Sequence, residues 1–338
     1  MKTRLSSLPG QSVFRLQSSC RASTLIITVW VLFMLATFAV ILGYSVRQKL
    51  SLVMRLKQRE EARYMSWANI ELALAEIRNK GKNVSLSVQD DRFKRAYSQV
   101  QEKAEDKPAA IENIYAIFDE ERKININKAD MHLLERLFKI ILGYHDIEAQ
   151  ELAAAIVDWR DKDSMLSIPL GSAEDSYYTD LPYPYECKDA DFDYLEELLL
   201  VKGVTGEVFE AIRDYVTVYT DGLVNVNTAP REVLLALGLS EQVVNNIFSF
   251  RCGKDKQRGT EDDNYFTSVS EIAVALTRLS ARNDAEIQNI ENVAARYLTV
   301  ECNYFMIESM VRFNQRQNAY VASCVADSSG KILYWQEL

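Results

Sequence analysis

The chain has 338 residues, of which 48% are hydrophobic and 26% are charged, and its formal net charge is −9. This length indicates two or three folded units, and the composition excludes a largely disordered chain. The negative charge argues against nucleic-acid binding through bulk charge. Two histidines leave little for histidine-based chemistry, and five cysteines without a CxxC pair argue against a zinc knuckle or a dense disulfide scaffold.

One membrane-spanning helix is expected near the N-terminus. Between Arg21 and Arg47 lie 25 residues without a charge, with an apolar core from Leu25 to Leu42. About 20 apolar residues cross a bilayer core, and a cleaved secretory signal would have a shorter apolar run followed by a small-residue cleavage site. The plainer alternative is an ordinary signal anchor. Basic residues on both flanks leave the orientation open.

The same helix is predicted to continue beyond the membrane. From Tyr44 to Arg78 there is no proline or glycine, and apolar residues recur at roughly helical spacing. Asn79, Gly81 and Asn83 together form a stop signal. We therefore expect a single helix of about 55 residues, against a mean of about 11 to 12 in globular proteins.

Strands are predicted at both ends of the remaining chain, and helices in its middle. Alternation and β-branched content predict strands over Val84–Val88, Asn113–Phe118, Tyr297–Tyr304, Met306–Asn314, Ala319–Ala326 and Ile332–Trp335. The last four are expected to form an antiparallel meander. Helical periods predict helices over Asp90–Glu105, Met131–Leu142, Ile147–Arg160, Tyr194–Lys202, Gly206–Tyr215, Arg231–Leu237, Glu241–Arg251 and Val269–Thr277. If both batches of strands share one sheet, the helical part is an insertion into it.

A weak internal repeat lies inside the helical part. Lys123–Leu134 resembles Leu223–Leu234, and in each copy a short apolar strand is followed by an asparagine, Asn127 or Asn227, that we expect to cap the next helix. The pattern resembles the helix-hairpin-helix or sterile-alpha-motif-like units of nucleic-acid proteins. The acidic charge and the lack of a GxG hairpin flanked by lysine or arginine argue against contact with DNA.

Two acidic stretches predict calcium sites. Between Asp158 and Glu197 there are 12 acids and 3 bases, and a second stretch has carboxylates on both sides of Gly259. Calcium prefers six to eight oxygen ligands, whereas Mg²⁺ prefers few carboxylates and retained waters. The candidate ligands are Asp161, Asp163 and Glu174 at one site and Asp255, Asp262 and Asp263 at the other. Neither stretch has EF-hand spacing, so solvated acidic surface remains an equal alternative.

No catalytic constellation is present in the sequence, which lacks GxSxG, HExxH and Walker motifs. A membrane-anchored hydrolase using the acids from Asp158 to Asp163 is kept as a third class of function. Cys302 and Cys324 fall in neighbouring predicted strands, so they are expected either to pair in an oxidising compartment or to be small core residues.

Six motifs in chain order resemble general secretion pathway protein K, the large minor pseudopilin family of the type II secretion system. The motifs lie at Leu25–Trp30, Phe118–Asn127, Ile156–Asp161, Leu195–Gly203, Val224–Pro230 and Ile332–Glu337. The resemblance implies an α+β, type IV pilin-like fold with a large inserted all-α domain of the helix-hairpin-helix or sterile-alpha-motif-like kind. Its expected parts are a basic leader over 1–22, the transmembrane and stem helix over 23–80, sheet segments over 81–122 and 295–338, and the insertion over 123–294.

The resemblance also implies where the chain is processed and placed. A prepilin peptidase is expected to remove the leader between Ala22 and Ser23, although the family usually has glycine where Ala22 stands. Cleavage on the cytoplasmic side would fix the N-terminus in the cytoplasm and the body in the periplasm, with a single pass through the inner membrane. The matching position for the glutamate of most pilins is Ile27, and its absence is typical of protein K.

The function implied is structural and not enzymatic. The chain is expected to cap the pseudopilus tip and to help start its assembly, with minor pseudopilins of types I and J and the other pseudopilins as partners. Calcium in the helical domain is also a family property, which favours the acidic loops as Ca²⁺ sites. The alternative is a competence-type pilin component that binds DNA through the helix-hairpin-helix-like repeat.

Overall fold

The computed structural model describes residues 20–80, 112–169, 171–258, 260, 262–280, 284–313 and 319–337. The chain divides into two compact units, the first ending at Glu60 and the second beginning at Glu61. The predicted strand over Val84–Val88 and the predicted helix over Asp90–Glu105 lie outside the described residues. Within these ranges, side chains are described from Thr24 onward, except at residues 80, 273, 276–280 and 284.

In the described residues, the first unit consists of residues 20–60 of one helix, α1 (Cys20–Lys80), which are apolar from Leu25 to Leu42 and charged from Arg47 onward. Its large side chains are exposed, including Trp30 at 63% and Leu35 at 59%. An 18-residue window in this helix has a mean hydropathy of 2.8 with none of it buried, and within the described residues this is the helix long and apolar enough to cross a membrane. The prediction of one long helix that ends near Lys80 is confirmed.

The second unit opens with the stem, which we define as residues 61–80 of α1. One stripe of the stem is buried at spacings of three and four residues, as an amphipathic helix requires. Its buried members are Ala62, Ser66, Asn69, Ile70, Ala73, Leu74 and Ile77. This stripe packs against a sheet, and Ile117, Phe305, Ile307 and Cys324 from the sheet share its core.

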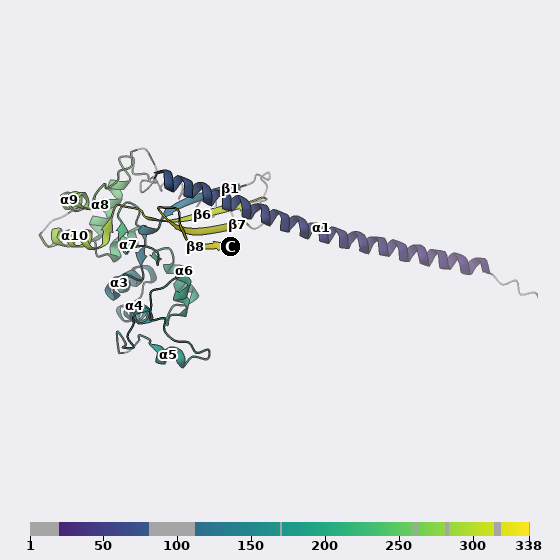
Figure 1. The fold of residues 1–338 in the computed structure, drawn as a ribbon, viewed down its shortest axis with the longest axis horizontal. Coiled ribbons are helices and arrows are strands. Elements are labelled where there is room, and N and C mark those ends of the chain that lie inside the picture. Colours follow the sequence, from purple (N-terminus) through teal and green to yellow (C-terminus); the bar gives the residue numbers. More distant parts are fainter. Residues whose placement is uncertain are drawn as a thin grey trace, which may run out of the picture. The chain divides into compact units, whose positions relative to one another are not determined.

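The sheet has four antiparallel strands in the order β1–β6–β7–β8 (Figure 1). Their bounds are β1 (Glu112–Asp119), β6 (Tyr304–Arg312), β7 (Tyr320–Asp327) and β8 (Ile332–Glu337). The first strand pairs with a strand far along the chain, with Asp119 opposite Phe305. Three of the four predicted final strands therefore form the expected meander, and the strand predicted over Asn113–Phe118 joins it.

The residues between β1 and β6 are mainly helical. The elements are η2 (Glu120–Arg122), β2 (Ile124–Asn125), α3 (Met131–Leu142), α4 (Asp146–Arg160), α5 (Asp175–Thr179), η3 (Leu195–Leu200), α6 (Gly206–Ile212), β3 (Val216–Thr217), β4 (Val224–Asn225), α7 (Arg231–Ala236), α8 (Glu241–Arg251), α9 (Val269–Ser280), α10 (Asp284–Tyr297) and β5 (Leu298–Thr299). One large hydrophobic core, which includes Leu134, Phe138, Ile156, Leu234 and Ile247, joins them. The bounds predicted for α3 and α8 are confirmed residue for residue.

The helical part is built from two consecutive copies of one plan. In the first copy, β2 pairs in parallel with the returning β3, and in the second copy β4 pairs in parallel with the returning β5. Between each outgoing and returning strand lie a turn, two helices, an acidic loop and further helical segments. The repeat that the sequence shows over 12 residues therefore extends over residues 124–217 and 224–299.

Matching side chains hold the turn of each copy. The Asn127 side chain exchanges two hydrogen bonds with the backbone of Phe192, and the Asn227 side chain exchanges two with the backbone of Phe266. Both asparagines were expected as helix caps, and that prediction is wrong. The cap residues are Asp130 and Pro230, three positions later, because the asparagines are used to tie the turn to a distant loop.

An arginine at the end of the second helix completes each copy. Arg160 donates to the carbonyl of Ala129 at 2.5 Å, and Arg251 donates to the carbonyls of Ala229 and Val226. These carbonyls belong to the turns of their own copies. The two turns are thus held from both sides, by an asparagine within the turn and by an arginine from the helix beyond.

Three further predictions need correction. The segment Tyr297–Tyr304 is not one strand, because α10 runs to Tyr297 and β5 has only two residues. The helix predicted over Tyr194–Lys202 is the shorter 3-10 helix η3. The helices α5 and α10 were not predicted: α5 has only 5 residues, whereas Ile290, Val293 and Ala294 of α10 are buried at helical spacing that the sequence analysis missed.

Candidate metal centre

Three carboxylates at the end of α4 and in the first acidic loop are close enough for their charges to raise the pKa of two of them. Each has one oxygen without a hydrogen-bond partner, although Asp158 Oδ1 accepts from the Ser167 backbone. Asp158 lies near the end of α4, Asp161 follows α4 as its C-cap, and Glu174 precedes α5 as its N-cap. Asp158 is fully buried and Glu174 is 4% exposed. One oxygen of each, Asp158 Oδ2, Asp161 Oδ1 and Glu174 Oε1, is buried without a hydrogen-bond partner. We call these three residues the oxygen cluster.

Burial and mutual repulsion raise the pKa of two members of the oxygen cluster, although the charge of Arg160 opposes the rise at Asp161. Burial and then the charges of Asp158 and Asp161 raise the pKa of Glu174 to about 7. Burial and then the charge of Asp163 raise the pKa of Asp161. A buried carboxylate without a partner is costly, and a bound cation removes both the desolvation cost and the mutual repulsion.

A cysteine borders the oxygen cluster. Ligand atoms of Glu174, Asp175 and Cys187 all lie within 4.8 Å of one another, and Cys187 is 8% exposed. The backbone N–H of Cys187 donates to Asp175 Oδ1 at 2.7 Å, which holds the loop before residue 187 against the start of α5. Burial, and then the nearby charges of Glu174 and Asp175, raise the pKa of the Cys187 thiol.

Two of the three ligands predicted in this loop are members of the oxygen cluster, and the third is not. Asp161 and Glu174 belong to the oxygen cluster. Asp163 is exposed, and its Oδ1 accepts a hydrogen bond from the Met165 backbone. Asp158 was in the acidic segment but was not among the predicted ligands. Its spacing of three from Asp161 at a helix end was the signal, since residues three apart share a helix face.

The second acidic loop follows α8 and is arranged differently. Asp262 Oδ2 accepts hydrogen bonds from the backbone of Lys254 and Asp255, and its Oδ1 accepts from Thr260. These bonds lower the pKa of Asp262. Asp255 Oδ1 accepts from the Gln257 backbone, and the Asp263 backbone donates to Thr260. The predicted ligands Asp255, Asp262 and Asp263 therefore lie close along one turn, with Asp255 and Asp262 bonded to that turn.

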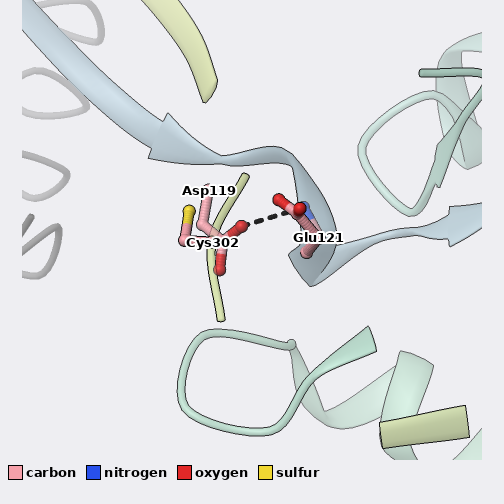
Figure 2. Close-up of side chains that lie close together, drawn as sticks. All are labelled: Asp119, Glu121 and Cys302. Carbon is pink, nitrogen blue, oxygen red and sulfur yellow. Dashed lines mark hydrogen bonds between the residues drawn. The ribbon is translucent and has the colours of Figure 1, made fainter. Parts of the chain in front are cut away.

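A third group of acidic side chains lies where the chain leaves and re-enters the sheet. Figure 2 shows Asp119 at the end of β1, Glu121 in η2 and Cys302 just before β6. Their ligand atoms lie within 4.8 Å of one another, and all three residues are buried. Burial and then the Asp119 charge raise the pKa of Glu121 to about 9.

All four carboxylate oxygens of this group already accept hydrogen bonds. Asp119 Oδ1 accepts from the Glu121 backbone, and its Oδ2 accepts from Asn225 at 2.8 Å and from Thr228 at 2.5 Å. Glu121 accepts from the backbone of Asn303 and Tyr304. The pair therefore joins the sheet to the second copy of the repeat. It is built as a structural junction, and Cys302 is a buried free cysteine beside it, as is Cys324 within the sheet core.

The residues predicted for processing lie at the start of α1. Ala22 and Ser23 are helical, and their side chains are outside the described range. Ile27 is 57% exposed on the same helix. It belongs to the apolar run, as expected for a position that faces lipid or another helix.

Taken together, the chain is a mixed helix-and-sheet protein with a long apolar N-terminal helix and a large helical part between two paired strands. Residues 89–221 match the family model described as type II secretion system (T2SS), protein K. The type II secretion system protein K of Aeromonas hydrophila is 37% identical over 101 residues, which are 29% of this chain and 30% of that protein. The protein of the same description from Pectobacterium carotovorum is 25% identical over 191 residues, 54% of this chain and 53% of that protein.

A solved structure extends the likeness to most of the fold. It is the crystal structure of the GspK–GspI–GspJ complex from the type 2 secretion system of enterotoxigenic Escherichia coli. The match has a TM-score of 0.60 at 16% identity and covers 85% of this chain and 99% of the matched chain. The matched stretches of the two sequence relatives cover about a third to a half of their lengths. The chain is thus related to type II secretion system protein K in sequence and shares the fold of the matched chain.

Proposed function

We propose that the chain is a minor pseudopilin of the type II secretion system that caps the pseudopilus tip and helps to start its assembly for protein export. The match of residues 89–221 to protein K is the observation that carries this proposal. The shared fold and the single long apolar helix support it. The proposed role is structural. The DNA-binding alternative is not favoured, because both sequence relatives are described as type II secretion system protein K.

The proposed fold is pilin-like, with the helical part inserted into the sheet. Support comes from the pairing of β1 with β6 across the whole helical part, with Glu112 opposite Arg312 and Asp119 opposite Phe305. The stem packs on this sheet through its buried stripe. A helix packed on an antiparallel sheet forms a hydrophobic core between the two layers. A large insertion between two strands of the sheet therefore leaves that core intact.

The proposed placement is a single pass through the inner membrane, with the N-terminus in the cytoplasm and the body in the periplasm. Prepilin peptidase is proposed to cut between Ala22 and Ser23. N-terminal sequencing of protein purified from membranes tests the cleavage: a chain that begins at Ser23 supports it, and a chain that begins at Met1 contradicts it.

The membrane role of α1 has a direct test with a matched control. A charge at mid-bilayer costs about 2.5 to 3.5 kcal/mol on insertion scales. Trp30→Arg should therefore reduce membrane retention. Trp67→Arg makes the same change in the stem, where Trp67 is 53% exposed, and should leave retention unchanged. Equal membrane content for both variants would contradict the proposed span.

The proposed partners are the minor pseudopilins of types I and J and, beyond them, the other pseudopilins. The matched solved structure is a GspK–GspI–GspJ complex. Co-expression of the full chain with the I and J proteins of the same genome tests this. Recovery of a three-protein complex in detergent, and loss of secretion in a strain lacking this chain, are the expected results. A chain that purifies alone and whose deletion leaves secretion unchanged contradicts the proposal.

We further propose calcium as the ligand of the oxygen cluster. The cluster offers Asp158, Asp161 and Glu174, each with an oxygen that is buried and without a partner. Calcium is a hard cation that binds carboxylate and carbonyl oxygens in flexible geometry, so this donor set fits it. A bound ion would supply positive charge to these carboxylates and would tie the end of α4 to the start of α5.

A further inference from the structure

We propose that a cavity between the two copies of the repeat binds a carboxylate carried on an apolar group. The free C-terminal residue of a protein chain and a small apolar acid both have this chemistry. The proposal goes beyond the tip role and depends on neither that role nor calcium binding, because the cavity shares no residue with the oxygen cluster or with the group of Asp119, Glu121 and Cys302.

The cavity has a volume of about 230 Å³ and is lined by three parts of the chain. These are the turn of the first copy, the link between the copies over residues 218–223, and the end of α10 in the second copy. An engineered apolar cavity of about 150 Å³ holds benzene, so this one has room for a side chain the size of leucine together with its carboxylate.

The apolar lining would receive the apolar part of the ligand. Ile124, Leu133 and Leu237 are buried in the wall of the cavity. Leu223 also lines it and is 40% exposed, so the cavity opens to solvent beside an exposed leucine. A ligand that covers this side chain would remove apolar surface from water, which favours binding.

Two cations from different copies border the cavity. Lys128 belongs to the first turn and pairs with Asp191 at 3.1 Å, and Arg296 belongs to α10 and pairs with Asp130 at 3.0 Å. The side chains of both cations are more than half exposed. Exposed ion pairs contribute little to stability, so a carboxylate from a ligand can compete for these cations at small cost.

The hydrogen-bonding groups of the cavity have spare donors. An ammonium group has three N–H donors and a guanidinium has five, and within the described part of the chain Lys128 and Arg296 each use one of them in an ion pair. Both oxygens of Asp130 are already occupied, by the Leu133 backbone and by Arg296 and Tyr297. The ligand should therefore supply acceptor oxygens, and a carboxylate supplies two.

The charge of the ligand is limited by the acids on the lining. Asp130 and Asp221 oppose the two cations, so a singly charged carboxylate fits better than a doubly charged phosphate. Asp221 is exposed, and solvent screens its charge.

A glycine brings the link between the copies against the first turn. Gly222 has a φ of +94°, and a Cβ atom there would lie 2.8 Å from the Cβ of Lys128. Glycine adopts this backbone conformation without strain and leaves room for the contact. The contact holds the base of Lys128 beside the cavity, so one carboxylate bound to Lys128 and Arg296 would connect the two copies.

The test uses the full chain in detergent and N-acetyl-leucine as the probe, followed by saturation-transfer NMR. N-acetyl-leucine should bind, and N-acetyl-leucinamide, which lacks the charge, should bind about tenfold more weakly or less. Arg296→Gln and Lys128→Gln should each weaken N-acetyl-leucine binding by about tenfold or more. Arg213→Gln is the matched control, because this exposed arginine pairs with Glu210 at 3.1 Å outside the cavity and its loss should leave binding unchanged.

A peptide that ends in leucine separates the two sources of the carboxylate. Tighter binding than N-acetyl-leucine, lost when the peptide is amidated, would identify a protein C-terminus as the ligand, and equal binding would identify a small acid.

A measurement on the wild type keeps the proposal falsifiable if the variants fail to fold. N-acetyl-leucine should slow acylation of Lys128, mapped by mass spectrometry, and should leave the exposed Lys331 unaffected. Equal affinity for the acid and its amide, unchanged binding in both cavity variants, or acylation of Lys128 at the same rate with and without N-acetyl-leucine would each overturn the site.

Discussion

The two copies of the helical repeat share one backbone plan but differ in what their acidic loops do. In the first copy, Asp158 and Glu174 are buried, and each has an oxygen without a partner. In the second copy, Asp255 and Asp262 are exposed and accept hydrogen bonds from their own turn. One backbone plan thus carries a first loop with buried acidic side chains and a second loop in which Asp255 and Asp262 are bonded to their own turn.

The arginines of the two copies also differ, and here the more deeply buried group belongs to the second copy. Arg251 is 2% exposed and donates to two turn carbonyls, whereas Arg160 is half-buried and donates to one. Burial lowers the pKa of both guanidinium groups, and more strongly that of Arg251. The turn of the second copy is therefore held by more arginine hydrogen bonds than the turn of the first copy.

The largest expected effect tests this difference between the arginines. Arg251→Met leaves the carbonyls of Ala229 and Val226 buried without a donor, and each such group costs about 1 to 3 kcal/mol, so a loss of about 3 to 5 kcal/mol is expected. Arg160→Met should cost about 1 to 2 kcal/mol because it frees one carbonyl. Thermal unfolding followed by tryptophan fluorescence measures both. An equal or larger loss for Arg160→Met would contradict the prediction that Arg251 contributes more to stability than Arg160.

The next effect is the pH dependence of the oxygen cluster. The folded pKa of Glu174, about 7, lies above its ordinary value of 4.5, so folding favours the protonated form. The stability that this gives is fully present below pH 4.5 and is lost as the pH rises through 7, with an upper bound of about 3 kcal/mol. Unfolding curves with a chelator present should show the decline, and Glu174→Gln should flatten it. An unchanged slope in that variant would show that Glu174 is charged in the fold.

Calcium should act on the first loop in preference to the second. A ligand at a hundredfold excess over its dissociation constant stabilises the folded state by about 2.7 kcal/mol. Excess Ca²⁺ after chelator treatment should therefore raise the melting temperature, and Asp158→Asn should abolish the rise. Asp262→Asn should keep most of it. A loss of the rise in Asp262→Asn alone would move the calcium site to the second loop.

The smallest effect sharpens the comparison of the two turns. Asn227→Ala removes two hydrogen bonds to the Phe266 backbone at a site that is 8% exposed, and about 2 kcal/mol should be lost. Asn127→Ala removes the equivalent pair at a half-buried site, and about 1 kcal/mol should be lost. Chemical unfolding of the two variants side by side measures the difference. Equal losses would show that the two turns are equally held.

Local patterns in the sequence were sufficient for much of the fold. The uncharged run after Arg21 and the helical spacing beyond it predicted α1, and the periods over Met131–Leu142 and Glu241–Arg251 gave α3 and α8 without error. These predictions succeed because periodicity within one element depends on near neighbours only. Asp161, Asp163 and Glu174 were chosen from the acidic segment, and the structure leaves Asp163 exposed and bonded to the Met165 backbone.

Tertiary structure decided what depends on residues far apart in the chain. Asn127 resembles a helix cap by its local sequence, but its side chain bonds to Phe192, so the cap falls at Asp130. Burial of Asp158 and the approach of Cys187 to Glu174 arise from packing between α4, α5 and the loop after it. No local period encodes such contacts, because they join segments whose spacing is set only when the core forms.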